Sequence, residues 1–308
     1  MLVFRNIQFR DSRDSSNKKS ISLPILGQKH KNDLVSFGEK NETILNYINY
    51  SLQISASRKF PFYTATNIDG SLFKRVGRAS SWKKDNRVNQ YQFGAELYTA
   101  ENSEFDKGHM TKRENVQWGE SIEDAKKASD STFYYTNAVP QHKDLNRRIW
   151  KRLENYILHK ETRNSELKIT VFTGPVLSQN DPYFVTEVRN ESIQIPILFW
   201  KVIIFSKENG ELHRVGFMMS QRKLLVDNGI VEELESFSDD ELFMQFDGAP
   251  TYQVNISFVE ELSGLTFPLA IDSYTDTRNL EVILEEIDIE LESYSTEHSF
   301  PYDLNIIL

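Results

Sequence analysis

A histidine that could act as a general base lies in the sequence Asp-Lys-Gly-His at residues 106–109. The glycine before His109 would let the backbone approach a phosphate, and Asp106 could orient the imidazole or hold the turn. Alone, this motif is weak evidence, because three fixed positions match by chance in roughly one chain of this length in twenty-five. The assignment of a base therefore depends on what else the chain provides.

A predicted helix after residue 145 carries polar side chains on the face that should be apolar. Asn146, Trp150, Leu153, Glu154 and Ile157 share one face at helical spacing. An amide and a carboxylate on this inward face indicate a polar partner such as a hydrated cation. The structural alternative is that Asn146 caps the helix and Glu154 pairs with a neighbouring Lys or Arg.

Basic residues are concentrated around these two segments. The opposite face of the predicted helix carries Arg147, Arg148, Lys151 and Arg152. A second basic run surrounds Trp82, shortly before the histidine motif, and contains Lys74, Arg75, Arg78, Lys83, Lys84 and Arg87. A solvated loop is the plain alternative for this run, but its place beside His109 favours phosphate contact.

The amino-acid composition limits the classes of protein to which the chain can belong. The 308 residues are 39% hydrophobic and 12% aromatic, which is enough for one large core. The chain has no cysteine, which excludes disulfides, thiolate zinc sites and cysteine nucleophiles. Apolar and β-branched runs predict strands within 49–66 and at 133–138, 169–172 and 193–205. Together with the helix they indicate an α+β domain with a sheet core.

Three segments together resemble the DNA/RNA non-specific endonuclease family, the ββα-metal nucleases that include endonuclease G. They are DKGHM at 106–110, TNAVPQ at 136–141 and LNRRIWKRLE at 145–154, in this order and spacing. The resemblance covers about residues 45 to 268. It implies a central, mostly antiparallel sheet flanked by helices, and metal-dependent hydrolysis of phosphodiester bonds in DNA and RNA with contacts mainly to phosphate.

The resemblance also implies roles for single residues. His109 is similar to the family's general base, and Asn146 to its one direct protein ligand of Mg²⁺, for which Mn²⁺ could substitute. Glu154 resembles the residue that holds the water shell of the metal, and Asn137 the asparagine beside it. Asp106 completes the expected catalytic set.

The expected substrate contacts depart in part from the family pattern. Lys107 stands where the family usually has arginine, so a point charge replaces a two-pronged hydrogen-bond donor. The upstream arginine of the family is best matched by Arg78, with Arg75 and Arg87 as alternatives. Arg148, on the basic face of the predicted helix, is a further expected phosphate contact.

We expect three parts in the chain: a polar N-terminal arm at 1–40, the nuclease domain at 41–270 and an acidic extension at 271–308. From Leu280 onward the extension has apolar residues at helical spacing, which predicts an amphipathic helix. The net charge is −9, yet residues 231–308 contain 19 acids and one base, so they carry −18 and the preceding 230 residues carry +9. The expected catalytic part is therefore basic.

The N-terminus has no apolar run of signal-peptide length and no segment would span a membrane, so we expect a cytoplasmic protein without a membrane partner. An unspecific nuclease in its own cytoplasm would be toxic. This favours a regulated effector, for example in cell death or phage defence. The alternatives are a catalytically silent nucleic-acid-binding homologue and a latent nuclease whose tail is a protein-interaction module. A homodimer and a regulatory partner or inhibitor are left open.

Overall fold

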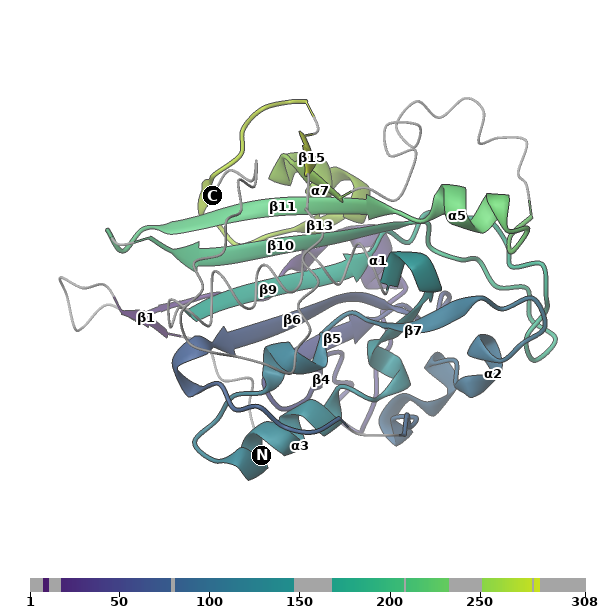
Figure 1. Cartoon of the computed structure of the whole chain (residues 1–308), viewed down its shortest axis with the longest axis horizontal. Helices are drawn as coiled ribbons and strands as arrows, with labels where there is room; N and C mark the ends of the chain where they lie inside the picture. The colour runs from purple at the N-terminus through teal and green to yellow at the C-terminus, as the bar shows by residue number, and fades with distance from the viewer. Residues whose placement is uncertain are drawn as a thin grey trace, which may run out of the picture.

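The structure is a computed structural model, and it describes residues 8–10, 18–78, 81–146, 168–207, 209–232, 251–278 and 280–282. Its centre is a nine-stranded sheet in the order β15-β12-β11-β10-β9-β6-β5-β4, with β14 also paired to β11 (Figure 1). The strands are β4 (Leu45–Asn46), β5 (Tyr50–Ile54), β6 (Pro61–Asp69), β9 (Lys168–Pro175), β10 (Leu198–Ser206), β11 (Leu212–Ser220), β12 (Thr251–Val254), β14 (Ile271–Asp272) and β15 (Leu280–Val282). Neighbouring strands are antiparallel except β11 and β14, so the predicted mostly antiparallel sheet is confirmed.

Smaller elements surround this sheet. Two-stranded pairs are formed by β1 (Gln8–Arg10) with β2 (Lys18–Ser20), β3 (Ile25–Leu26) with β13 (Leu265–Thr266), and β7 (Phe105–His109) with β8 (Ala138–His142). The helices are α1 (Gln28–Asn32), α2 (Ala95–Tyr98), α3 (Ile122–Ser131), α5 (Arg222–Asp227) and α7 (Ile256–Ser263). Short 3-10 turns are η1 (Gly70–Leu72), η2 (Asn86–Tyr91), η3 (Arg113–Val116) and η4 (Tyr135–Asn137). Within the described residues, no helix combines the length and the apolar character needed to cross a membrane.

Both faces of the central strands are buried, which explains why β10 is almost continuously apolar in sequence. On one face, the ring of Phe267 packs against Phe172 of β9 and Trp200 of β10, with ring centroids 5.9 and 5.1 Å apart. Helix α7 covers the same region, because a Cβ on Gly216 would touch Ile256. A second, smaller core lies between the β4–β5 end of the sheet and α3 (Figure 1).

The β7–β8 ribbon packs on the other face and carries the predicted site. Just after β7, the hydroxyl of Thr111 lies 2.7 Å from that of Thr66 in β6, which attaches the ribbon to the main sheet. The backbone turns helical over residues 143–146, where the sequence predicts the start of a helix. The continuation from residue 147 to 167 lies outside the described residues.

Residues 21–40, which the sequence assigns to the N-terminal arm, take part in the domain. Strand β3 pairs with β13, and the side chains of Ile21, Leu26 and Val35 are buried in the cores. At the other end, β14 and β15 extend the main sheet beyond residue 270. We therefore propose that the domain begins near residue 21, rather than 41, and continues to about residue 282.

Two predicted elements differ from the structure. The sequence predicts a strand at 133–138, but residues 135–137 form the turn η4, and β8 begins at Ala138. This turn is favoured because the Asn137 side chain bonds to nearby backbone groups instead of leaving them to a sheet. The acidic segment expected to be helical from Leu280 begins as strand β15, and from residue 283 it lies outside the described residues.

Gly174 offers a test of the packing at the centre of the sheet. A Cβ at this position would collide with the carbonyl oxygen of Phe62 and lie 2.8 Å from the Trp200 ring. Gly174→Ala should therefore lower the free energy of unfolding by about 1–3 kcal/mol, measured by chemical denaturation. Gly77→Ala, where a Cβ meets nothing within 4 Å, is the control. Equal stability of the two variants would contradict the packing described.

Candidate active site

The register of the β7–β8 ribbon sorts the predicted residues onto two faces. Asp106 is opposite Gln141, and His109, at the end of β7, is opposite Ala138. Because side chains alternate along a strand, Lys107 and His109 share one face, and Asp106 shares the other with Gln141. The backbone positions of Asp106 and His109 are about 10 Å apart along the strand.

His109 lies between two aromatic rings. The Trp82 ring centroid is 4.5 Å from that of the imidazole, and the Phe133 ring meets it edge-on at 5.0 Å and 85°. Nε2 is covered and has no hydrogen-bond partner among the described residues. Arg78 approaches from the solvent side, with its guanidinium carbon 5.8 Å from the centre of the Phe133 ring.

This environment keeps the imidazole neutral. Burial lowers the pKa of His109 to about 3, and the positive charges of Arg78, Arg113 and Lys112 act in the same direction. A neutral imidazole with an unpartnered ring nitrogen can accept a proton. The His109 imidazole is thus in the proton-accepting form at neutral pH.

Asp106 and Asn146 form the second group. The amide nitrogen of Asn146 donates a hydrogen bond to Asp106 Oδ2 at 3.1 Å, so the nitrogen side of this amide faces Asp106 and the amide oxygen points away from it. Across the ribbon, Gln141 is fully buried and neither of its amide atoms has a partner among the described residues. Amide and carboxylate oxygens of this kind are ligands that suit Mg²⁺.

These residues fit a metal held mostly by water. Within the part of the chain that the structure describes, no three His, Cys, Asp or Glu side chains come close enough to hold an ion by themselves. A site based on one amide oxygen needs no such cluster, because hydrated Mg²⁺ keeps most of its waters. Glu154, predicted to hold those waters, and Arg148 lie outside the described residues.

The side chain of Asn137 is fully engaged in hydrogen bonds to the backbone. Its side-chain oxygen accepts a hydrogen bond from the Thr111 amide at 2.8 Å, and its nitrogen donates to the carbonyls of Thr111 and Thr132 at 2.9 and 3.0 Å. The side chain is fully buried, and both of its amide hydrogens are used. We therefore propose that Asn137 fixes the turn after His109, in place of the metal-site role that the sequence suggests.

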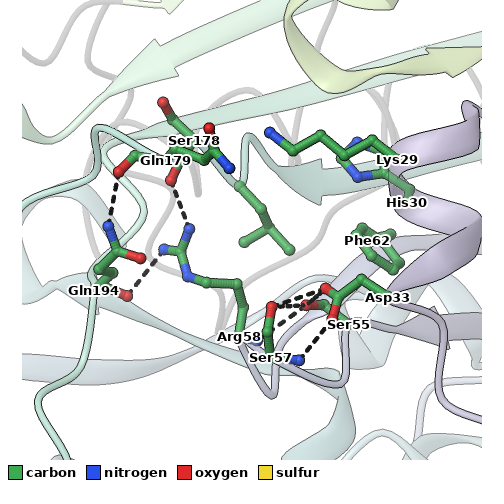
Figure 2. Close-up of a pocket in the computed structure, with 11 residues that line it drawn as sticks. Lys29, His30, Asp33, Ser55, Ser57, Arg58, Phe62, Ser178, Gln179 and Gln194 are labelled. Atoms are coloured by element: carbon green, nitrogen blue, oxygen red, sulfur yellow. Dashed lines mark hydrogen bonds between the residues drawn. The ribbon is translucent and has the colours of Figure 1, made fainter.

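A pocket of about 340 Å³ lies elsewhere on the domain, and none of the predicted site residues lines it (Figure 2). Arg58 reaches into its wall, where it donates hydrogen bonds to the carbonyls of Ser178 at 2.7 Å and Gln194 at 3.0 Å. Opposite, the carboxylate of Asp33 accepts hydrogen bonds from Ser55 and Ser57. This network fastens the N-terminal segment to the loop after β9.

The chain was compared with protein families, curated proteins and solved structures. The family model for DNA/RNA non-specific endonucleases matches residues 29–273. The chain belongs to this endonuclease family.

Individual relatives cover less of the chain. An uncharacterised protein, y4fB, of Sinorhizobium fredii is 35% identical over 220 residues, 67% of this chain and 32% of that protein. Human mitochondrial endonuclease G is 27% identical over 148 residues, 46% of this chain and 47% of its own. Mouse mitochondrial nuclease EXOG is 25% identical over 246 residues, 76% and 59% respectively. This chain thus spans about a third to three fifths of the length of these relatives.

The fold agrees with the family. The crystal structure of the EndoG/EndoGI complex is similar over 73% of this chain and 85% of that chain, with a TM-score of 0.52 and 21% sequence identity. The predicted ββα-metal nuclease fold is therefore confirmed.

The predicted phosphate-contacting residues that the structure describes lie in different surroundings. Arg87 is engaged elsewhere, because its guanidinium pairs with Asp85 at 2.6 Å and lies over the Tyr47 ring at 4.9 Å. Arg78 is exposed beside the rings that enclose His109, which favours it over Arg87 for the upstream arginine. Lys107 lies with its ammonium 5.3 Å from the Tyr98 ring centre, on the same strand face as His109.

Three contributions to the site were not identified from sequence. In the sequence, Trp82 stands in the middle of a basic run and Phe133 within a predicted strand, and neither position indicates that both contact His109. Gln141 ends the TNAVPQ segment, which was the available signal. Gln141 also gives a reason for glycine at position 108. A Cβ on residue 108 would collide with the Gln141 side chain, whereas the sequence alone suggests that Gly108 makes space for a phosphate.

The low pKa of His109 predicts how cleavage depends on pH. The neutral, active imidazole persists as pH falls until it approaches about 3, whereas an ordinary histidine with a pKa of 6.5 would already be protonated near pH 6. The acid limb of kcat/KM should therefore lie well below pH 6.5. In Trp82→Ala, water should reach the imidazole ring and raise its pKa, so the loss of kcat/KM on acidification should begin at a higher pH. If the kcat/KM of the wild type fell with an apparent pKa of 6.5, and Trp82→Ala did not change that value, the buried environment described for His109 would be wrong.

Proposed function

We propose that this chain is a metal-dependent, non-specific endonuclease that hydrolyses phosphodiester bonds in DNA and RNA. The observation that carries the proposal is the neutral His109, whose Nε2 has no hydrogen-bond partner among the described residues, on the same short strand as Asp106, which bonds to Asn146. Family membership supports it, and the relatives named endonuclease G and EXOG agree with it.

His109 acts as the general base. A ring nitrogen of His109 takes a proton from water as the water oxygen attacks phosphorus in line with the leaving 3′ oxygen. The 3′ oxygen leaves with the electron pair of the broken P–O bond and takes a proton from solvent, and the imidazolium later returns its own proton to solvent. The positive charges of Arg78, Lys112 and Arg113, which act on His109, also attract the phosphate. Asp106 holds the Asn146 amide so that its oxygen can bind the ion. Mg²⁺, when bound, supplies positive charge for the phosphate and the leaving oxygen.

The substrate range follows from what this chemistry contacts. Phosphate contacts carry no base information, and the proposed attack neither needs nor excludes a 2′-hydroxyl. DNA and RNA should therefore both be cleaved, with little sequence preference. Mn²⁺ should replace Mg²⁺, because it accepts the same oxygen ligands.

Regulation is a separate part of the proposal. The EndoG structure is that of a complex concerned with EndoG inhibition, and this supports an inhibitor or regulatory partner for the present chain. A role as an intracellular effector would need such control. Endonuclease G and EXOG relatives are named mitochondrial, so the cytoplasmic placement stays a prediction. A catalytically silent homologue remains the rival, and a cleavage assay separates the two.

Replacement of the base tests the activity directly. His109→Ala should reduce cleavage of plasmid DNA and of RNA by about 10²–10⁴-fold, with DNA binding nearly unchanged, because the imidazole transfers a proton and adds little affinity. His30→Ala, on helix α1, should cut at the wild-type rate. More than a tenth of wild-type activity in His109→Ala would remove the residue from this role.

Replacement of the amide tests the metal assignment. Asn146→Ala should raise the Mg²⁺ concentration for half-maximal cleavage by more than Asp106→Asn does, because the first loses the ligand oxygen and the second loosens its orientation. Asp106→Asn, which loosens the orientation of the Asn146 amide, should lower the metal affinity by about 10–100-fold. Asn102→Ala, an exposed amide bonded to Thr186, is the control. Unchanged metal dependence in both site variants would contradict the assignment.

A further inference from the structure

The outer edge of β8 is completed by one side chain. Strand β8 pairs with β7 on one edge, so the carbonyl of Pro140 and the amide of His142 face the other way. The side-chain oxygen of Gln221 accepts a hydrogen bond from the His142 amide at 2.7 Å, and its nitrogen donates to the Pro140 carbonyl at 3.1 Å. A primary amide therefore takes the place that a peptide group of a neighbouring strand would occupy.

The second hydrogen on the same nitrogen ties this edge to the main sheet. It bonds to the carbonyl of Pro196, just before β10, at 2.7 Å. The backbone amide of Gln221 also bonds to the Ile197 carbonyl at 2.9 Å, which continues the β10–β11 pairing by one step. Gln221 is fully buried, so no water can replace these bonds.

The three hydrogen bonds of the Gln221 side chain, here called the clamp, lie close to the proposed metal site along the chain. His142 ends β8 four residues before Asn146, and the Asp144 amide donates to the His142 ring at 3.2 Å in between. Across the ribbon, the residues paired with 140–142 are 105–107, which include Asp106. Movement of this end of β8 would therefore displace both members of the Asp106–Asn146 pair.

We propose that Gln221 is a positioning residue of the nuclease site. Its amide fixes the β7–β8 ribbon against the end of strands β10 and β11 and thereby sets the place of Asp106 and Asn146. The inference rests on the proposed function, because it assumes that this pair serves the metal. Gln221 itself touches neither substrate nor metal in this role.

Gln221→Met is the main variant, because it keeps the side-chain length and removes the three hydrogen bonds. It should raise the half-saturating Mg²⁺ concentration for plasmid cleavage about tenfold and lower kcat, with the KM for DNA at saturating Mg²⁺ little changed. Amide hydrogen exchange in residues 138–146 should be faster, a readout that needs neither metal nor activity. Gln221→Glu, which keeps the acceptor for His142 but loses both donors, should also show the Mg²⁺ effect.

Gln92→Met is the matched control. Gln92 is fully buried and makes the same set of bonds, accepting from the Asp85 amide and donating to the carbonyls of Asp85 and Val88 at 2.8, 2.8 and 3.0 Å, but within one loop. It should lose similar thermal stability while its Mg²⁺ requirement stays within about twofold of wild type, since the metal ligand is undisturbed.

The outcomes separate the two proposals. Wild-type Mg²⁺ dependence in a folded Gln221→Met, or the same shift in Gln92→Met, would overturn the positioning role. If Gln221→Met does not fold, Gln221→Asn, which keeps a shorter amide, is judged by the same criteria. An inactive wild-type protein would overturn the proposed function instead. In that case unchanged exchange of residues 138–146 in the folded Gln221 variant would overturn the clamp as well.

Discussion

The site depends on satisfying the backbone of a ribbon that has only two strands. Such a ribbon has two outer edges, and any N–H or C=O buried there without a partner costs about 1–3 kcal/mol. One side-chain amide meets this demand at the outer edge of β8, and another satisfies backbone groups at the end of the ribbon beyond His109. Gln221 bonds to Pro140 and His142 on the β8 edge, and Asn137 bonds to Thr111 just beyond His109. Because these amides are buried, the ribbon has a defined place, and so do the groups that it carries.

The two faces of the ribbon keep two kinds of chemistry apart. His109 lies among aromatic rings and cations, which lowers its pKa, whereas the Asp106 carboxylate bonds to Asn146. A carboxylate against the imidazole would stabilise the imidazolium and raise the pKa. The sequence alone suggests that Asp106 could orient the base, whereas the structure shows its carboxylate bonded to Asn146. In the proposed mechanism, one short motif would thus supply the base and, three residues earlier, a group that orients the metal ligand.

What could be predicted from sequence was what is local in the chain. His109 and Asn146 stand in short motifs, and the strands predicted within 49–66, at 169–172 and at 193–205 follow from apolar runs, although β10 begins only at Leu198. The enclosure of His109 could not be predicted, because Trp82 and Phe133 are 51 residues apart in the sequence and show no periodic signal. The turn at 135–137 was missed because the side chain of Asn137 outweighs the strand propensity of its neighbours.

The cations around His109 raise a difficulty that the substrate resolves. A base with a pKa near 3 accepts protons poorly, since the most effective base has a pKa near the working pH. Part of the shift comes from Arg78, whose exposed guanidinium lies beside the rings that enclose His109, and a phosphate bound there would oppose that charge. Substrate binding should therefore raise the pKa of His109 and strengthen the base where the scissile phosphate is present. Before binding, burial and the nearby cations keep the imidazole neutral.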